Sequence, residues 1–211
     1  MPIHKSIKAS VVDINSDTPK PSDRFFVDTN VLFWMGYSKA SHLAFNPLQY
    51  QVNDYPNYTD LAIGKDCKLF HTGLCISELV HLIEYSELKI FNSNKSEDQK
   101  IKIKTFRNNY PIERCKVHTE IKLACEYVTS TSELLSANID LEKSQSLVRE
   151  FDICKVDGYD FFNLKVMHLN NITQIITDDS DFACIDDITL FTANQTVIRS
   201  AKKQGKLVTR R

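Results

Sequence analysis

Residues 24–32 read RFFVDTNVL, and this stretch decides how the rest of the chain is interpreted. Its short apolar run stops at Asp28, which predicts a buried strand that ends at a polar break. Thr29 or Asn30 could cap the helix that follows. Because ligands of open α/β sheets bind outside the carboxyl ends of the strands, Asp28 is a candidate site residue. A single aspartate there is more often only a cap or turn residue, so other acids must reach equivalent places.

The composition is that of an ordinary globular protein. The chain has 211 residues, of which 42% are hydrophobic and 25% charged, enough for one sizeable domain. Its formal net charge of −1 means that a nucleic acid would have to be attracted by a local basic patch. No apolar stretch approaches the roughly 20 residues that span a bilayer, and the first 17 residues lack a signal-peptide core. The six cysteines form no CxxC or CxxH pattern, so we expect reduced thiols, a cytoplasmic location and no membrane partner.

Short β-rich runs alternate with helical patterns along the chain. This alternation predicts an α/β fold with a central, mostly parallel sheet and helices on both faces. The expected strands, after the one at residues 24–27, lie at 68–70, 172–176 and 188–191. The expected helices lie at 31–37, 60–67, 71–91, 113–137, 140–151 and 157–169, with a final one from about residue 194.

The flanking segments divide the chain into three parts. We expect an N-terminal extension at 1–23, the main domain at 24–198 and a basic C-terminal tail at 199–211. The extension ends in a turn-rich linker, and the apolar run before that linker could add an edge strand. Residues 41–58 show no sustained period, which favours a long loop or an insertion near the mouth of the site.

Further acids fall where strands end or helices begin. Carboxylates that converge on one cleft repel each other strongly unless a cation lies between them. Mg²⁺ is typically held by a few carboxylates together with waters and substrate phosphate, and such sites promote phosphodiester hydrolysis. The acids placed in this way, besides Asp28, are Glu78, Asp157 or Asp160, Asp178, Asp179 and Asp181.

With these acids in view, the chain resembles the PIN-domain nucleases, and in particular bacterial ones of the VapC toxin type. The matching pieces are FVDTNVL at 26–32, ISEL at 76–79, the helix that opens at Asp160, and TDDSDF at 177–182. They occur in the family's order over roughly residues 24–195. The resemblance implies a three-layer α/β/α fold that cuts RNA, or sometimes DNA, with Mg²⁺ or Mn²⁺.

The resemblance also implies roles for individual residues. Asp181 would be an additional metal ligand, while Asn30 and Thr177 would orient carboxylates or water. The acids that would be both catalytic and metal-binding are Asp28, Glu78, Asp160 and Asp179.

Two of these assignments have a rival in the sequence. Asp157 competes with Asp160 for the third acid, and Asp178 competes with Asp179 for the fourth. A slip of one residue at the end of an element changes which side chain points inward, so both alternatives stay open.

Two segments are longer than in compact VapC-type toxins. Residues 41–67 and 92–150 could carry extra substrate contacts or a partner surface. Basic side chains gather without acids in part of the second segment and in the tail, where they form solvated faces or contact phosphates. The candidates for such contacts are Lys100, Lys102, Lys104, Arg107, Lys202 and Lys203.

These observations predict a metal-dependent endoribonuclease that uses one or two Mg²⁺ or Mn²⁺ ions. The expected reaction is in-line attack by water that leaves a 5′-phosphate and a 3′-hydroxyl, with no covalent intermediate. The biological role would be that of a toxin in a toxin–antitoxin or defence system, inhibited by an antitoxin or another protein. The resemblance also suggests a homodimer. The alternatives are a non-catalytic PIN-like RNA-binding module and a DNA nuclease.

Overall fold

The computed structural model describes residues 6–42, 46–136 and 156–210. In these residues, six strands form one sheet in the spatial order β1–β6–β5–β2–β3–β4, and every neighbouring pair is parallel. The predicted parallel sheet is therefore confirmed. The strands are β1 (Ser10–Asp13), β2 (Arg24–Val27), β3 (Lys68–Thr72), β4 (Glu133–Leu135), β5 (Gln174–Ile176) and β6 (Thr189–Thr192).

Strand β2 lies in the middle of this sheet, between β5 and β3. Its residues Phe25, Phe26 and Val27 are completely buried. A parallel strand covered on both faces reads as a continuous apolar run rather than an alternating one. The stretch at 24–32 therefore forms the buried strand and helix start that its sequence predicts.

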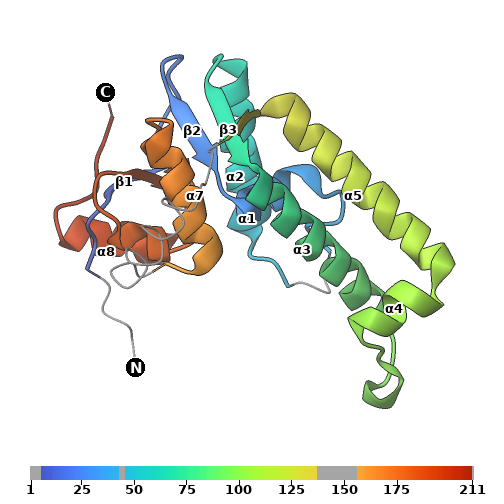
Figure 1. The fold of residues 1–211 in the computed structure, drawn as a ribbon. Coiled ribbons are helices and arrows are strands. Elements are labelled where there is room, and N and C mark those ends of the chain that lie inside the picture. The colour runs from blue at the N-terminus through green and yellow to red at the C-terminus, as the bar shows by residue number, and fades with distance from the viewer. Residues whose placement is uncertain (1–5, 43–45, 137–155, 211) are drawn as a thin grey trace.

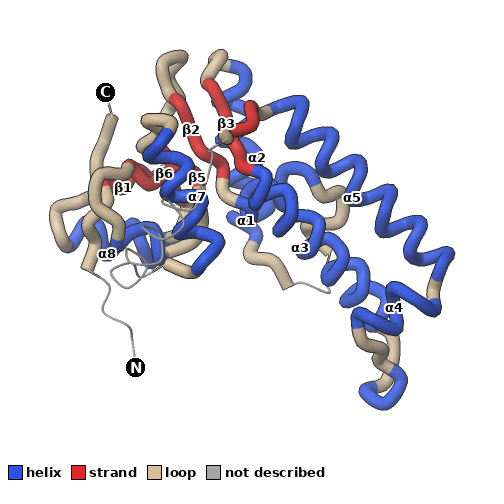
Figure 2. Tube along the Cα trace, in the orientation of Figure 1, coloured by secondary structure: helices blue, strands red, loops and turns tan. Residues whose placement is uncertain are grey.

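Helices cover both faces of the sheet and give the protein three layers (Figure 1, Figure 2). Helices α7 and α8 lie on one side, whereas α3 and α5 lie on the other and pack with α1, which also contacts α2. This arrangement confirms the α/β fold class. The helices in the described part of the chain are α1 (Thr29–Gly36), α2 (Gln49–Gly64), α3 (Gly73–Asn92), α4 (Ile103–Asn109), α5 (Pro111–Thr131), α7 (Gly158–Leu169) and α8 (Gln195–Lys203).

The loop expected at 41–58 is wrong from Gln49 onward, where α2 begins. Tyrosine, threonine and alanine form the apolar stripe of this helix, so a search for aliphatic periodicity does not detect it. The ring of Tyr58 packs on Phe25 of β2 with centroids 6.0 Å apart, which fixes α2 on the sheet. The buried residues of α2 recur at spacings of three and four and are Tyr55, Tyr58, Thr59 and Ala62.

Helices α3, α4 and α5 form an arm that extends away from the sheet (Figure 1). Helix α3 has 20 residues, which makes it about 30 Å long. A small separate core of Leu88, Phe106 and Val117 holds the three helices together at the far end. Beside this core, the buried carboxylate of Glu84 accepts hydrogen bonds from the guanidinium groups of Arg107 and Arg114.

The segments before residue 24 and after residue 198 pack on the sheet, although the domain boundaries predicted there stay predictions. Strand β1 pairs with β6 at one edge, so the N-terminal run does form the edge strand that its sequence allows. Near the C-terminus, Arg210 donates to Asp17 at 2.9 Å and to Asp23 at 2.8 Å. Its guanidinium carbon lies 4.6 Å from the ring centroid of Phe191 in β6.

The middle of the chain differs from expectation in one further place. The helix predicted at 113–137 ends at Thr131, and strand β4 follows it. The helix predicted at 140–151 lies outside the described residues. In the part of the chain that the structure describes, no helix is long and apolar enough to cross a membrane. The described cysteines are free thiols: Cys67, Cys75, Cys115, Cys125 and Cys184.

Candidate active site

The candidate acids lie beyond three adjacent strands, at one edge of the sheet. Strands β5, β2 and β3 are neighbours and parallel, so their carboxyl ends meet there. Asp28 directly follows β2, the run that contains Asp179 follows β5, and Glu78 lies in the second turn of the helix that follows β3. Asp160 lies in the first turn of α7. The topology therefore brings the four acids toward one another, as open α/β sheets do with their ligand sites.

Asp28 both caps α1 and faces the site. It is 4% exposed, and its Oδ1 accepts a hydrogen bond from the backbone N–H of Thr29 at 2.7 Å. Its Oδ2 accepts from Nδ2 of Asn30 at 2.7 Å and from the hydroxyl of Thr177. The expectation that Thr29 or Asn30 caps the helix is wrong, because Asp28 itself is the cap residue. The Asp28 side chain can therefore cap α1 and at the same time face the other candidate acids.

Thr177 connects two of the acid-bearing strand ends. Its hydroxyl donates to Asp28 and accepts from the backbone N–H of Asp179 at 2.9 Å. Nδ2 of Asn30 lies 3.4 Å from the same hydroxyl. These contacts agree with the orienting roles predicted for Asn30 and Thr177, because both side chains hold the Asp28 carboxylate in place.

Burial and mutual repulsion raise the pKa of two of the acids. Burial raises the pKa of Asp28 to about 7; hydrogen bonds from Thr177 and Thr29 oppose this rise, and the charges of Glu78 and Asp179 add to it. Burial is also the main cause of the raised pKa of Asp160, which reaches about 8. Charges that push it further come from Asp28, Asp157, Asp179 and Glu78. A site with this much unbalanced negative potential is suited to a cation.

The structure separates Asp157 from Asp160. Oδ1 of Asp157 accepts a hydrogen bond from the backbone N–H of Asp160 at 3.0 Å, so Asp157 caps α7 and is exposed. Asp160 is half-buried and electrostatically coupled to Asp28. This geometry favours Asp160 as the site residue, with Asp157 fixing the start of its helix.

The structure also separates Asp178 from Asp179. Asp178 faces α2, where its carboxylate accepts hydrogen bonds from Tyr55 at 2.8 Å and Gln51 at 2.7 Å. Asp179 lies on the side of Thr177 and Asp28. Oδ1 of Asp179 accepts from the backbone N–H of Asp181 at 2.8 Å, at the first residue of the short 3₁₀ helix Asp181–Cys184. This geometry favours Asp179 over Asp178 as the site acid.

The donor chemistry suits Mg²⁺ or Mn²⁺, but the side chains as they stand do not form a complete cage. In the described residues, no three Asp, Glu, His or Cys side chains are grouped so that they could hold one metal ion. Charges shift a pKa over several ångströms, whereas a ligand oxygen must approach Mg²⁺ to about 2.1 Å. Since Mg²⁺ usually takes only one or two protein carboxylates plus waters and substrate phosphate, a complete cage is not required. Among the described residues, the buried Oδ1 of Asn30 has no hydrogen-bond partner.

The basic candidates for nucleic-acid contacts lie away from the acids. Lys100 forms an ion pair with Glu97 beyond the end of α3, whereas Arg107 pairs with Glu84 in the middle of α3. Lys102 and Lys104 are exposed beside them at the start of α4. Glu84 follows Glu78 by six residues in α3, a rise of about 9 Å along the helix, so Arg107 lies one to two turns beyond the acids. In the other group, Lys202 and Lys203 are exposed in the last turn of α8.

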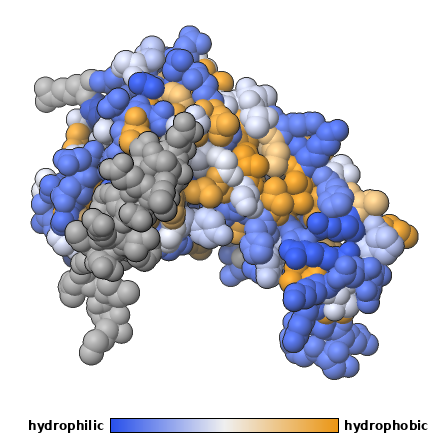
Figure 3. All heavy atoms as spheres, in the orientation of Figure 1, coloured by the Kyte–Doolittle hydropathy of each residue, from blue (hydrophilic) through white to orange (hydrophobic). Residues whose placement is uncertain are grey.

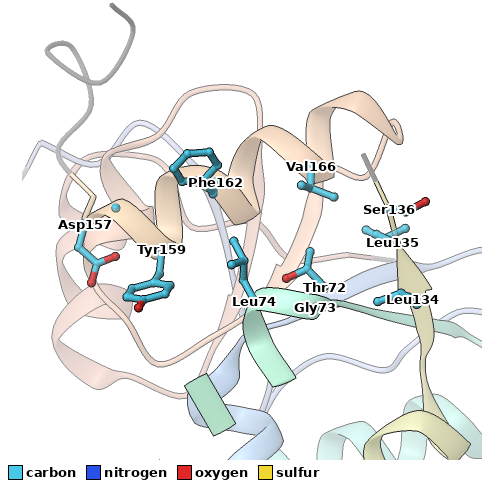
Figure 4. Close-up of a pocket in the computed structure, with 11 residues that line it drawn as sticks. Thr72, Gly73, Leu74, Leu134, Leu135, Ser136, Asp157, Tyr159, Phe162 and Val166 are labelled. Atoms are coloured by element: carbon cyan, nitrogen blue, oxygen red, sulfur yellow. The ribbon is translucent and has the colours of Figure 1, made fainter. Parts of the chain in front are cut away.

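Sequence reasoning missed a pocket of about 820 Å³ that begins beside Asp157. Figure 4 shows Leu74, Tyr159 and Phe162 around the space between α7 and the start of α3. The side chain of Leu134 is also part of the lining and is 62% exposed. On the face seen in Figure 3, hydrophobic residues gather between α7 and α3. The pocket is therefore a largely apolar surface beside the start of α7, whose first turn carries Asp160.

Comparisons with known proteins leave the function to be argued from this geometry. No protein-family model matches the chain, and no curated protein matches it. Among solved structures, the chain is similar to one in the crystal structure of VapBC2 from Rickettsia felis bound to a DNA fragment from their promoter. The TM-score is 0.43 and the identity 12%, over 80% of this chain and 97% of that chain. A likeness at this level carries no argument about function.

Proposed function

We propose that this protein is a metal-dependent endoribonuclease with a PIN-like fold that hydrolyses RNA phosphodiester bonds. The position of Asp28 carries the proposal. This aspartate is buried at the end of the central strand and is electrostatically coupled to acids from two other elements, Glu78 of α3 and Asp179 after β5. Asp160 of α7 is coupled to the same group. Acids from four places in the sequence converge on one edge, where open α/β sheets bind their ligands.

The chain's own residues would bind and orient rather than react. Asp28, Glu78, Asp160 and Asp179 would hold Mg²⁺ or Mn²⁺, with Asp181 as an additional ligand. When bound, the divalent cation supplies a Lewis acid that stabilises charge on the phosphoryl oxygens. Hydrogen bonds from Asn30 and Thr177 support this assignment, because they fix the Asp28 carboxylate before any substrate arrives.

The proposed biological role is that of a cytoplasmic toxin of a toxin–antitoxin or defence system, paired with an inhibitory protein. This role and the proposed homodimer have the sequence resemblance as their support. Expression of the wild-type chain is expected to arrest growth, and Asp28→Asn is expected to relieve the arrest. A wild-type chain that leaves growth unaffected would contradict the toxin role and leave the nuclease proposal open.

The nuclease proposal is tested with labelled RNA and DNA oligonucleotides of matched sequence and Mn²⁺. We expect RNA cleavage that stops in excess EDTA and in Asp28→Asn and Asp179→Asn. Asp186→Asn is the matched control, because Asp186 is an exposed acid that pairs with Lys8. Full RNA cleavage by Asp28→Asn, or in excess EDTA, would refute the proposal, whereas cleavage of DNA alone would identify a DNA nuclease.

A PIN-like module that binds RNA without cutting it is the other outcome that this experiment can show. Such a module would bind RNA equally well with Mn²⁺ or with EDTA and would release no product. The same oligonucleotide experiment therefore separates the two functions.

A further inference from the structure

Asp178 is the acid of the TDDSDF run that the proposed metal site does not use. Its Oδ1 accepts a hydrogen bond from the hydroxyl of Tyr55 at 2.8 Å. Its Oδ2 accepts from Nε2 of Gln51 at 2.7 Å and from the hydroxyl of Tyr50 at 3.2 Å. All three donors belong to the first two turns of α2. Asp178 is therefore held by the helix that packs beside the site.

The hydroxyl of Tyr55 also contacts the residues that follow β5 and the end of β6. Tyr55 is completely buried, and its hydroxyl lies 3.2 Å from the carbonyl oxygen of Thr177 and 2.9 Å from the hydroxyl of Thr192. The same hydroxyl accepts a hydrogen bond from the backbone N–H of Ala193 at 3.0 Å. One phenol thus connects α2 to the ends of both β5 and β6.

A second contact fixes the backbone at Asp178. Nδ2 of Asn194, the residue that caps α8, donates to the carbonyl oxygen of Asp178 at 3.0 Å. On the other side of the run, the backbone N–H of Asp179 donates to the Thr177 hydroxyl. The hydrogen bonds of this run therefore divide it, with Thr177 and the Asp179 amide on the Asp28 side and the Asp178 carboxylate on the α2 side.

We infer that Asp178 is a positioning residue, which Gln51 and Tyr55 hold so that Thr177 and Asp179 both face Asp28. This inference rests on the proposed function, because it assigns Asp178 to the support of that site. Without the anchor, the run would lose the contacts that hold the Asp178 carboxylate on the α2 side, and with them a constraint on Thr177 and Asp179. Outer hydrogen-bond partners of metal ligands typically change metal affinity 10- to 100-fold when they are removed.

The alternative is that these bonds only dock α2 on the sheet, and Mn²⁺ affinity separates the two roles. We expect Tyr55→Phe and Asp178→Ala each to raise the Mn²⁺ dissociation constant by about 10-fold in calorimetric titrations. Asp178→Asn is expected to recover much of the affinity, because its amide can still accept the hydrogen bond from Tyr55. In an Asp179→Asn background, Tyr55→Phe is expected to have a smaller effect than in the wild type, since one of the two groups that it positions has lost its charge.

Tyr58→Phe is the matched control. Tyr58 is a buried tyrosine of the same helix, but its hydroxyl donates at 2.6 Å to Asp17, not to the acid-bearing run. Its loss should lower the melting temperature and leave the Mn²⁺ dissociation constant within about twofold, since no support of a metal ligand is removed. Equal losses of Mn²⁺ affinity in Tyr58→Phe and Tyr55→Phe would assign both residues to docking alone.

Failure of this inference differs from failure of the proposed function. Wild-type protein that binds Mn²⁺ and cuts RNA, with Asp178→Ala behaving identically, would overturn only the role of Asp178. Wild-type protein that neither binds Mn²⁺ nor cuts RNA would overturn both. Hydrogen exchange in the metal-free protein adds a readout without activity: Tyr55→Phe should speed exchange at the Asp179 amide and leave the amides of β2 protected.

Discussion

The hydroxyl of Thr177 donates a hydrogen bond to the carboxylate of Asp28, although 149 positions separate the two residues in the chain. The bond joins the end of β5 to the end of β2 and lies at the centre of the acid cluster. It also lowers the pKa of Asp28 against the effect of burial. The state of this one carboxylate therefore depends on how two strand ends are held together.

Replacement of Thr177 should weaken the site without unfolding the protein. Thr177→Val removes the hydroxyl while keeping the side-chain shape, so Asp28 loses a donor and the Asp179 amide loses an acceptor. We expect RNA cleavage to fall 10- to 100-fold, the typical loss when an outer partner of a metal ligand is removed. Thr177→Ser keeps the hydroxyl and should retain most of the activity. Equal cleavage rates in wild type and Thr177→Val would contradict the orienting role.

Replacement of Asp28 by asparagine should abolish RNA cleavage without lowering the melting temperature. The pKa of Asp28 is raised to about 7, so its ionised form is disfavoured in the folded state without metal. Asn is also a good helix cap, so Asp28→Asn keeps the cap of α1. We therefore expect a melting temperature in EDTA at pH 8 that is at least that of wild type, with no RNA cleavage. A large loss of melting temperature would show that the charge stabilises the fold.

Stability of the metal-free protein should fall as pH rises. Burial chiefly raises the pKa of Asp28 to about 7 and of Asp160 to about 8, from 3.8. Between pH 4 and 8 the folded state therefore holds protons that the unfolded chain has released, so this stabilisation is full at pH 4 and is lost above pH 8. The melting temperature measured in EDTA should therefore fall as the pH rises from about 4 to about 8.

The divalent cation should remove this decline. In thermal unfolding with Mn²⁺ we expect a higher melting temperature at pH 8, because the cation stabilises the ionised acids. The double variant Asp28→Asn with Asp160→Asn should flatten the dependence in EDTA over the same pH range. A wild-type protein whose stability in EDTA rises steadily from pH 5 to pH 8 would contradict the raised pKa values.

The stability of the arm formed by α3, α4 and α5 should depend on the buried carboxylate of Glu84. Glu84 is 4% exposed and bonds both Arg107 and Arg114, so Glu84→Gln leaves two cations short of a partner. Since both arginines are partly exposed, we expect a loss of about 1–3 kcal/mol in the free energy of unfolding. Glu97→Gln breaks an exposed pair with Lys100 and should cost less than about 1 kcal/mol in urea unfolding. Equal losses would refute the burial argument.

RNA contacts of the arm can be measured by salt dependence. If RNA reaches α4, Lys102→Ala with Lys104→Ala should weaken binding of long RNA and reduce the slope of log K against log salt by about 1 per lost phosphate contact. Lys202→Ala with Lys203→Ala tests the end of α8 in the same way. Lys116→Ala is the control, because Lys116 pairs with Glu113 on α5. An unchanged slope in both double variants would assign these lysines to solvated faces.

The amino-acid sequence alone predicts the central strand and the parallel sheet. Local patterns suffice for these features, because a strand buried on both faces must be continuously apolar and because strand ends are marked by polar breaks. The choice of Asp28, Glu78, Asp160 and Asp179 as site acids came from the resemblance of their motifs, and their roles stay predictions. The sequence missed residues 49–59 of α2 because the buried stripe there is built from tyrosine and threonine at the positions of aliphatic residues.

The neighbouring acids are distinguished only by their contacts in the folded chain. Asp157 and Asp160 are three residues apart and Asp178 and Asp179 are adjacent, so no periodicity distinguishes them. The choice depends on partners distant in the chain: Tyr55 and Gln51 draw Asp178 toward α2, and Thr177 holds the Asp179 amide beside Asp28. The raised pKa of Asp28 likewise depends on burial and on charges from other elements, which exist only after the strands have come together.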